Sequence, residues 1–597
     1  MTTPSPALKH LLTAALLCVL ACGMAVAQAP TAPPSSIRLN QLGYYPTAPK
    51  RAFVVGAAGG EAFRVVAQGG SEAVYEGRLS PKRDYREQAG EVGAWADFSA
   101  LTQPGSDYVL EVQGHGTSYP FAVGASVYAE ALPASVKSYY FQRAGTPVSE
   151  AFGGAYARPA GHPDDRVRYH RTSGRDTTAT HASPGGWYDA GDYNKYIVNA
   201  GYSVGVMLQL LDQFGHDVLA DGSIAFPESG NGRNDLLDEL KYELDWMLTM
   251  QDPADGGVHH KLTTENFEGM VMPHEATAPR YILAKSTTAS YDFAACMALA
   301  SRVFAKAPAS RSKAGEAAYA KTCLDAAERA FAWAADHPDA PFKNPAGVRT
   351  GEYGDADAGD ERMWALAELW VTTGQPRYAR PFFNERVRIR FEAGENWTGY
   401  MANLAAFSLL EHADEIAAGQ PLWRELTKAM RRDVLAVADG LLAKSDTTAY
   451  RSPVTDWHWG SSSDVLGAAT FMVQAYRLTG EPRYLAAARA YTDLVFGLNA
   501  TGYSWVTGFG ARTPMNIHHR PSAADGVAAP VPGFVVGGPN SRQQDVSNDT
   551  VYPVAAGEYP MRSYADQEES YASNEVCLNW NAPLVYVLGA LEAYGAK

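Results

Sequence analysis

The stretch Thr373–Tyr378, TGQPRY, recurs with one change at Thr479–Tyr484, TGEPRY. In both copies a run with helical spacing ends at a glycine, Gly374 or Gly480, and a proline follows two residues later. Glycine commonly ends helices, and proline is favoured in the first turn of the next one. The repeat therefore predicts tight helix-to-helix turns, and many helix pairs joined in this way favour an α/α toroid, a closed ring of helical hairpins.

Helical periodicity extends on both sides of these turns. In Asn234–Gln251 the leucines and methionines lie on one helical face and the charged residues on the other. The same pattern predicts helices at Tyr202–Phe214, Thr287–Phe304, Glu316–Ala335, Arg362–Thr372, Leu422–Ala443, Val465–Leu478 and Arg483–Phe496. We therefore expect residues 126–597 to form one large all-α domain. The Gly- and Pro-rich stretches 155–190, 252–285 and 500–574 are too long to be simple connectors, so we expect functional loops there.

Residues 36–125 have a different sequence pattern, which is typical of a β-sandwich. Short runs rich in β-branched or aromatic residues alternate with glycine and proline. These runs are Ile37–Leu42, Ala52–Val55, Phe63–Ala67, Ala73–Tyr75, Trp95–Phe98, Tyr108–Val112 and Tyr119–Val123. The sequence thus predicts a small β domain followed by a large helical one.

The first 27 residues have the features of a secretory signal peptide. A basic start precedes the apolar run Leu11–Met24, and Ala25–Ala27 offers a small-x-small cleavage site. The run is too short to span a membrane. Residues 28–35 would form a short proline-rich tether. We expect secretion, either extracellular or periplasmic, and attachment of a lipid at Cys22 is the alternative.

Charge and cysteine content exclude several classes of protein. The formal net charge of −15 disfavours a nucleic-acid partner, and no segment after the signal reaches the length of a membrane span. Cys296, Cys323 and Cys577 remain after cleavage, an odd and widely spaced set that indicates neither a disulfide scaffold nor a zinc site. One bridge between Cys296 and Cys323 stays open as an interpretation.

Two carboxylates lie three residues apart in Gly185–Tyr193, GGWYDAGDY. A close carboxylate pair can raise one pKa, bind a cation, or hold one water between two acceptors. The structural alternative for Asp189 and Asp192 is a turn that caps the following helix.

The run Tyr564–Pro583 is also dense in carboxylates. Glu575 lies beside apolar and aromatic residues, which would raise its pKa and allow it to donate a proton. A solvated acidic turn is the alternative, and it fits Glu568 and Glu569 better than Glu575.

A third candidate stretch, Ser504–Arg512, is rich in glycine and is followed by His518–Arg520. Glycine turns let the backbone approach a ligand closely. His518 and Arg520 can point in the same direction from an extended segment. Metal binding by the neighbouring histidines is disfavoured because their side chains point apart and no third ligand is evident.

Together these stretches resemble the family 9 glycoside hydrolases. One family signature matches from Ser504 to Arg520, and the Asp-Ala-Gly-Asp motif matches at 189–192. A second signature runs through Tyr564, Asp566, Tyr571, Glu575, Asn581 and Ala582, and departs at Cys577, where the family usually has Ser, Thr or Ala. The resemblance covers residues 130–597. The stretch NQLGY at 40–44 resembles the N-terminal immunoglobulin-like module of one branch of the family.

The resemblance implies an (α/α)6 barrel that hydrolyses β-1,4-glucan with inversion. Asp192 would activate the attacking water as general base, and Asp189 would share and orient that water. Glu575 would protonate the leaving oxygen. Such chemistry requires two carboxyls about 6.5–9.5 Å apart with room for a water between them.

The resemblance also implies substrate-binding residues. His518 and Arg520 would bind sugar hydroxyls next to the cleaved bond, and Trp459 would be a stacking platform. The other candidates are Tyr571, Asp566, Trp457 and Trp505. For the tryptophans, a packed position in the core is the alternative.

Many family members hold a structural calcium ion in the region that corresponds to 355–361. Asp357, Asp360 and Glu361 could supply oxygen ligands there, although calcium needs six to eight. Carboxylates are also favoured at the start of a helix without any metal. No cofactor is expected for the chemistry itself.

The sequence thus predicts a secreted, monomeric, inverting endo-β-1,4-glucanase that acts on soluble or amorphous glucans. The nearest alternative is an exo-acting enzyme of the same family, or one that cleaves a decorated or mixed-linkage β-glycan. A catalytically silent glycan-binding protein is opposed by the three carboxylates. A toroidal polysaccharide lyase would need a Tyr or Lys base, and an acidic cleft opposes its anionic substrate.

Overall fold

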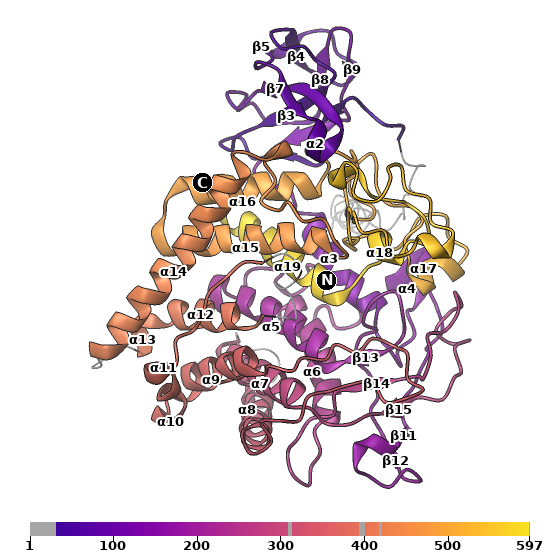
Figure 1. Cartoon of the computed structure of the whole chain (residues 1–597), viewed down its shortest axis with the longest axis vertical. Coiled ribbons are helices and arrows are strands. Elements are labelled where there is room, and N and C mark those ends of the chain that lie inside the picture. The colour runs from indigo at the N-terminus through magenta and orange to yellow at the C-terminus, as the bar shows by residue number, and fades with distance from the viewer. Residues whose placement is uncertain (1–31, 308–312, 393, 395–399, 417–420, 596–597) are drawn as a thin grey trace, which may run out of the picture.

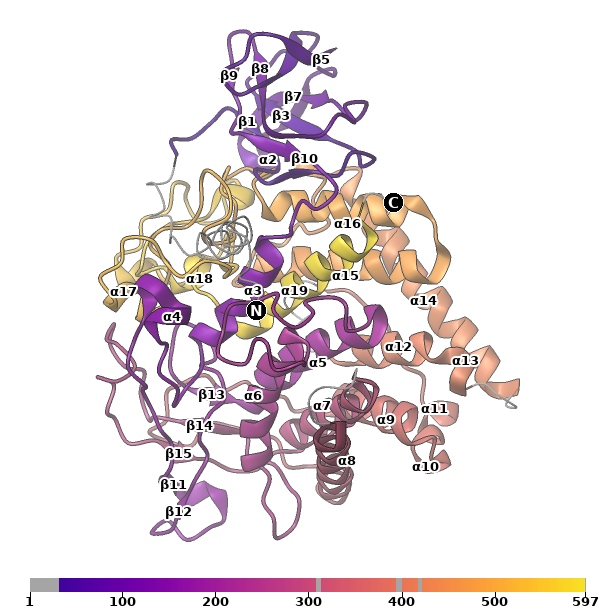
Figure 2. The same cartoon turned by 180° about the vertical axis from the view of Figure 1, so that it is seen from behind.

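The computed structural model describes residues 32–307, 313–392, 394, 400–416 and 421–595. A small β domain lies at one end of a large helical body (Figures 1 and 2). The proposed signal peptide and the beginning of the tether lie outside the described residues.

The N-terminal domain is a sandwich of two sheets. One sheet has the strand order β1 (Ile37–Arg38), β3 (Arg51–Val55), β7 (Glu91–Asp97), β6 (Arg83–Tyr85). The other has the order β2 (Gly43–Tyr44), β10 (Phe121–Val123), β8 (Gly105–Val112), β4 (Ala62–Ala67), β5 (Ala73–Arg78), with β9 (Gly116–Thr117) beside β8. In β4, Phe63 and Val65 are buried and Arg64 between them is exposed, so one face of the strand lines the core between the sheets.

The helical body contains a ring of neighbouring helices. These are α5 (Ile197–Phe214), α7 (Thr287–Lys306), α9 (Gly359–Thr373), α12 (Ala402–Glu411), α15 (Ser461–Thr479) and α19 (Leu578–Tyr594). Helix α5 contacts α7 and α19, α9 contacts α7 and α12, and α15 contacts α19. Phe407 of α12 meets Phe471 of α15 with ring centroids 5.3 Å apart. The contacts therefore run around a closed circle.

A second set of helices packs outside this ring. These are α3 (Ala131–Phe141), α6 (Asp235–Thr249), α8 (Lys313–Asp336), α10 (Pro376–Ala379), α14 (Pro421–Ser445) and α16 (Pro482–Val495). Helix α3 contacts α19, α6 contacts α5, α8 contacts α7, and α10 contacts α9. Helices α14 and α16 both contact α15. The short helices are α2 (Arg86–Ala89), α4 (Glu150–Gly153), α11 (Pro381–Asn384), α13 (Ala413–Ile416), α17 (Arg520–Ala524) and α18 (Tyr571–Asn574). Over the described ranges, no helix has both the length and the apolar character needed to cross a membrane.

The repeated hexapeptide forms the predicted turn twice. Helix α9 ends at Thr373 and α15 at Thr479, each followed by a left-handed glycine, and a proline then opens α10 or α16. In both turns the tyrosine hydroxyl donates to an outer helix, from Tyr378 to Glu328 at 3.0 Å and from Tyr484 to Asp439 at 2.8 Å. The prediction from the repeat is confirmed, and the motif also docks each turn onto its neighbour.

A five-stranded sheet within the helical body was absent from the sequence prediction. Its order is β12 (Thr180–His181), β11 (Val167–Tyr169), β15 (Tyr281–Ile282), β14 (Lys261–Thr263), β13 (Lys195–Tyr196). Most of it falls in the stretches expected to be loops, where strands of two or three residues are too short to show alternation. Figure 1 shows this sheet and the loops before α19 on the same side of the body.

The three cysteines in the described part of the chain do not pair. Cys296 in α7 and Cys323 in α8 are both free and buried, so the bridge left open by the sequence is not formed. Cys577 is also free and buried.

Buried polar contacts join the sandwich to the helical body. The Asn40 amide donates to the Asp493 carboxylate of α16 at 2.7 Å and to the Tyr128 hydroxyl at 3.0 Å. Burial raises the pKa of Asp493 to about 7. Nearby, the Tyr45 hydroxyl donates to Glu592 of α19 at 2.6 Å. These buried and partly buried contacts fix the two domains together.

Replacement of Asn40 by alanine should destabilise the whole protein. The change leaves the buried Asp493 carboxyl without its side-chain donor, and an unsatisfied buried group costs about 1–3 kcal/mol. We expect the free energy of unfolding to fall by about 2 kcal/mol, with a lower melting temperature in a thermal scan followed by circular dichroism. Ser106→Ala, on the exposed end of β8, is the matched control and should leave the melting temperature unchanged. Equal melting temperatures for the two variants would show that this contact does not stabilise the protein.

Candidate active site

The two aspartates of the Asp-Ala-Gly-Asp motif lie in a buried loop directly before β13 and α5. The Asp189 carboxylate accepts hydrogen bonds from the Asn199 amide at 2.8 Å and from the Tyr353 hydroxyl at 2.9 Å. The Asp192 carboxylate accepts from the backbone N–H and the side-chain amide of Asn194, each at 3.0 Å. Both aspartates are therefore held in fixed orientations before any ligand binds.

Backbone contacts bring this loop to Glu575. The backbone N–H of Arg520 donates to the Gly191 carbonyl at 3.1 Å, and His518 pairs with Glu575 in a parallel bridge. A Cβ on Gly191 would lie 2.2 Å from the His518 carbonyl oxygen, so only glycine permits this approach. The Leu578 N–H also donates to the Asp189 carbonyl at 2.9 Å. Three segments far apart in the sequence thus form one site.

Burial and like charge set the protonation of the site. Burial, then the charge of Asp192, raises the pKa of Asp189 to about 8. The same two causes, in the same order, raise the pKa of Glu575 well above its usual value, against the opposing charge of Arg520. Glu575 therefore holds its proton to a higher pH than an exposed glutamate does. A protonated carboxyl beside a second carboxyl is the arrangement that general acid and base catalysis requires.

His518 and Arg520 lie at the junction between these segments. The His518 Nδ1–H donates to the Glu568 carbonyl at 2.6 Å, and burial lowers the pKa of the ring, so Nε2 of the neutral imidazole remains an acceptor. The Arg520 guanidinium donates to the Gly191 carbonyl at 2.7 Å and to the Glu268 carbonyl at 2.9 Å. Arg520 thus clamps the aspartate loop to the segment before β15.

An aromatic surface adjoins His518. The ring centroids of Trp459 and Tyr571 lie 5.2 Å apart, and those of Tyr571 and His518 lie 6.2 Å apart. Trp459 is 42% exposed, although it is a large apolar side chain. The structure therefore places Trp459 and Tyr571 together, next to the carboxyls, with an open ring face.

The other two tryptophans require a correction. Trp457 and Trp505 are 2% and 0% exposed and pack against each other in the core, with centroids 6.1 Å apart. Neither ring has an exposed face for a sugar, so the core alternative holds for both.

Asp566 also differs from its predicted role. Its carboxylate accepts from the backbone N–H groups of Met515 and Asn516, at 3.0 and 2.8 Å, and from the Asn574 amide at 3.2 Å. These contacts tie the segment that precedes His518 to the segment that precedes Glu575. The carboxylate is used inside the protein and orients the site rather than facing a substrate.

Two of the predicted calcium ligands, Asp360 and Glu361, lie close together and act on each other's pKa. The Asp357 carboxylate accepts from the Gly359 N–H at 3.0 Å, and that of Asp360 accepts from the Met401 N–H. Glu361 is buried, and burial and then the charge of Asp292 of α7 raise its pKa. Burial and then the charge of Asp360 raise the pKa of Asp292. Across the described residues, no group of three or more His, Cys, Asp or Glu side chains could hold a metal ion. The described residues therefore do not show the expected calcium site, and calcium stays a prediction.

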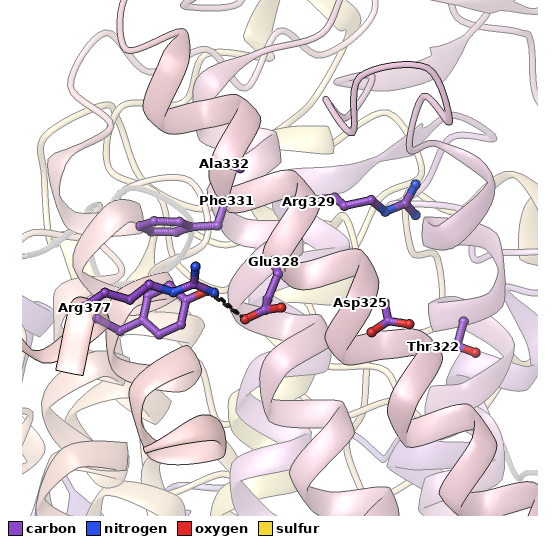
Figure 3. A pocket seen from close by; sticks show the side chains of 8 residues that line it. Thr322, Asp325, Glu328, Arg329, Phe331, Ala332 and Arg377 are labelled. Atoms are coloured by element: carbon purple, nitrogen blue, oxygen red, sulfur yellow. Dashed lines mark hydrogen bonds and ion pairs between the residues drawn. The ribbon is translucent and has the colours of Figure 1, made fainter. Parts of the chain in front are cut away.

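A hollow of about 870 Å³ lies elsewhere, between α8 and α10 (Figure 3). In it the Arg377 guanidinium pairs with the Glu328 carboxylate at 2.6 Å. The other lining residues are Thr322, Asp325, Arg329, Phe331, Ala332 and Tyr378. This ion pair is exposed to solvent and lies on the outer helices. It does not resemble the cluster formed by Asp189, Asp192 and Glu575.

The sequence interpretation missed the residues that hold the aspartates. Asn194 and Asn199 follow the motif closely, and an amide beside a catalytic carboxylate could have been noticed. Tyr353 comes from a distant loop, and no local signal connects it to Asp189.

Comparison with known proteins identifies the family. Residues 128–588 match the model of glycosyl hydrolase family 9, and residues 32–117 match that of the cellulase N-terminal Ig-like domain. The chain is 40% identical to the xyloglucan-specific endo-beta-1,4-glucanase BoGH9A of Bacteroides ovatus, over 96% of each protein. It is 34% identical to endoglucanase D of Acetivibrio thermocellus, over 94% of this chain and 84% of that one.

Solved structures agree with these matches. The structure of Bacteroides ovatus GH9 superposes with a TM-score of 0.84 at 38% identity, over 94% of this chain and 99% of that one. An endoglucanase from Alicyclobacillus acidocaldarius superposes with a TM-score of 0.81 at 31% identity, over 94% of this chain and 100% of that one. This chain is therefore a glycoside hydrolase that belongs to family 9, with an N-terminal immunoglobulin-like domain.

Proposed function

We propose that this protein is an inverting endo-β-1,4-glucanase in which the ring of helices forms an (α/α)6 barrel. The observation that carries the proposal is the Glu575 carboxyl, whose pKa is raised by desolvation and by the charges of the neighbouring Asp192 and Asp189. Inverting hydrolysis takes place in a single step and needs one general acid and one general base that activates water. It needs no covalent nucleophile, so these carboxyls suit it.

Each carboxyl then has a distinct part in the reaction. Asp192, fixed by the two donors of Asn194, would take a proton from the attacking water. Asp189, held by Asn199 and Tyr353, would orient that water. Glu575 would protonate the leaving glycosidic oxygen as the bond breaks. Protein carboxyls and water suffice for this chemistry, and no metal takes part in it.

The aromatic surface would bind the sugar chain. Trp459 offers an open ring face for a glucose ring, and Tyr571 lies between it and His518. Nε2 of His518 would accept a hydrogen bond from a sugar hydroxyl. The polymer would thus be held beside Glu575 by stacking and oriented by the imidazole.

A decorated glucan is the second candidate substrate. It is favoured by the 40% identity to a relative named as a xyloglucan-specific endo-β-1,4-glucanase. We also infer that the protein is secreted through its N-terminal signal peptide and acts as a monomer.

The first test is hydrolysis by the wild type and by Glu575→Gln. We expect the wild type to cleave carboxymethyl-cellulose or xyloglucan internally and to release α-anomers, as followed by NMR. The ratio of rates on the two polymers decides between the plain and the decorated substrate. The glutamine cannot donate the proton, so kcat should fall about 10²–10⁴-fold.

Glu569→Gln is the matched control, because this exposed carboxylate lies in the same segment. It should keep wild-type kcat. Release of β-anomers would contradict inversion, and an active Glu575→Gln variant would contradict the assignment of the acid.

The pH dependence of the wild type should report the protonated acid. Because Glu575 must carry a proton and its pKa is raised, kcat/KM on cello-oligosaccharides should stay high above pH 4.5 and fall only as the pH rises through that raised pKa. A dinitrophenyl cellobioside needs no proton on its leaving group, so its profile should lack this alkaline limb. An identical alkaline limb for both substrates would assign it to another group, such as Asp189.

Removal of the stacking platform should weaken substrate binding. Trp459→Ala loses a ring face of the size that a sugar covers, so we expect KM for cello-oligosaccharides to rise roughly tenfold with little change in kcat. Phe383→Ala is the control, since Phe383 of α11 is similarly exposed at 38% on an outer helix. Equal KM values for both variants would place the sugar chain elsewhere.

A further inference from the structure

One buried residue holds both oxygens of the Asp192 carboxylate. Asn194 is 0% exposed, and its backbone N–H and side-chain Nδ2 each donate to a different oxygen of Asp192 at 3.0 Å. Two donors from the same residue fix the plane of the carboxylate as well as its position. No comparable pair of donors is recorded for Glu575 within the described part of the chain.

The orientation of the Asn194 amide is determined by β14 and the residue after it. Its Oδ1 accepts from the Thr264 N–H at 3.0 Å and from the Thr263 hydroxyl at 2.8 Å. A backbone N–H can only donate, so the oxygen of the amide must face Thr264. The NH₂ group therefore faces Asp192.

Strand pairing places these groups opposite each other. The antiparallel register of β13 and β14 pairs Lys195 with Leu262 and Tyr196 with Lys261. Continuation of this register sets Asn194 opposite Thr263. The small sheet that the sequence did not reveal is therefore the element that aligns Asn194 with its partners.

A buried lysine begins a chain of hydrogen bonds that ends at the Asp192 carboxylate. Lys261 Nζ donates to the Thr350 hydroxyl at 3.1 Å, and the Thr350 and Thr263 hydroxyls lie 2.7 Å apart. Because an ammonium can only donate, the Thr350 hydroxyl accepts from Lys261 and can donate to the Thr263 hydroxyl. The Thr263 hydroxyl in turn has two acceptors in reach, the Asn194 Oδ1 at 2.8 Å and the Thr264 carbonyl at 2.9 Å. Such a chain is polarised in one direction and reinforces its members.

The lysine itself is held firmly within the protein. Lys261 is 0% exposed, and its Nζ also donates to the Asn344 side chain at 2.7 Å and to the Gly351 carbonyl at 2.6 Å. The charges of Asp192 and Asp189 act on it and oppose the effect of burial, which lowers its pKa to about 7. Three hydrogen bonds thus fix the Lys261 Nζ at the far end of the chain from Asp192.

We propose that Asn194 is a positioning residue for the general base, and that the Lys261–Thr350–Thr263 chain fixes the Asn194 amide. The side chain turns the Asp192 carboxylate so that a lone pair faces the attacking water. This inference rests on the proposed function, since it concerns how Asp192 acts as the base. The backbone carbonyl of Asn194, which accepts from the Asp189 N–H at 3.0 Å, would be retained in any substitution.

The test compares Asn194→Ala, Asn194→Asp and Thr263→Val in the full-length enzyme. We expect Asn194→Ala to lower kcat about 10²-fold with KM unchanged, because a small misplacement of a reacting group has an effect of this size. Asn194→Asp keeps the shape but loses the donor, so it should be no more active than Asn194→Ala. Thr263→Val should lower kcat less, since Thr264 still holds the amide oxygen. Rescue by the isosteric aspartate would overturn the proposal, because it would show that Asn194 only fills space.

A second substrate separates the base from the acid. A dinitrophenyl cellobioside bypasses proton donation, so Glu575→Gln should recover much of its rate on it, whereas Asn194→Ala should remain about 10²-fold slow. Recovery of Asn194→Ala on this substrate would overturn the proposal by placing its effect on the acid. Asn499→Ala is the matched control, because Asn499 is 1% exposed and hydrogen-bonded on both ends of its amide away from the site. It should lower the melting temperature but keep wild-type kcat.

Failure of the proposed function is distinguishable from failure of this inference. A wild type that does not cleave β-1,4-glucans would reject the substrate, and the same variants would then be compared on the β-glycan that it does cleave. Equal kcat values for wild type and Asn194→Ala on any cleaved glycan would reject the positioning role.

Discussion

The structure depends on the gathering of three carboxyls in one place that is largely shielded from water. Asp189, Asp192 and Glu575 repel one another and lose hydration there, which is why the pKa values of Asp189 and Glu575 are raised. Such a cluster persists only where the surrounding structure fixes it. The fixing comes from backbone contacts, above all the approach of Gly191 to the His518 carbonyl and the hydrogen bond from Leu578 to Asp189.

The ring of helices explains how these contacts arise. Asp189 and Asp192 come directly before β13 and α5, and Glu575 comes directly before α19. Because α5 and α19 are neighbours in the ring, the segments that lead into them meet at one end of it. Carboxylates are favoured near helix N-termini, so both helices also oppose the repulsion within the cluster. The chemistry is thus a consequence of closing the ring between its first and last members.

Much of this could be predicted from sequence where the signal was local. The amphipathic helices and the TGxPRY turns have periodic or positional signals, and the three carboxylates lie in distinctive motifs. Helices α3 and α12 were not predicted, because most of their residues are buried on every side and show no polar face. The burial of Trp457 and Trp505 and the internal hydrogen bonds of Asp566 depend on contacts with distant segments, which the sequence does not show. The proximity of Glu361 to Asp292 likewise follows from the packing of α7 against α9, which no local pattern reveals.

The sandwich domain is connected to the site through the loop before His518. The Gln41 side chain accepts from the Arg512 N–H at 2.9 Å and donates to the Gly502 carbonyl at 3.1 Å, so it holds both ends of the segment between them. Gly510 allows this, since a Cβ there would lie 2.9 Å from the Gln41 side-chain oxygen. The same chain continues to Met515 and Asn516, whose N–H groups are bound by Asp566, and then to His518. Contacts at the domain boundary therefore restrict the segment that presents the imidazole, and the β domain contributes to the geometry of a site that it does not touch.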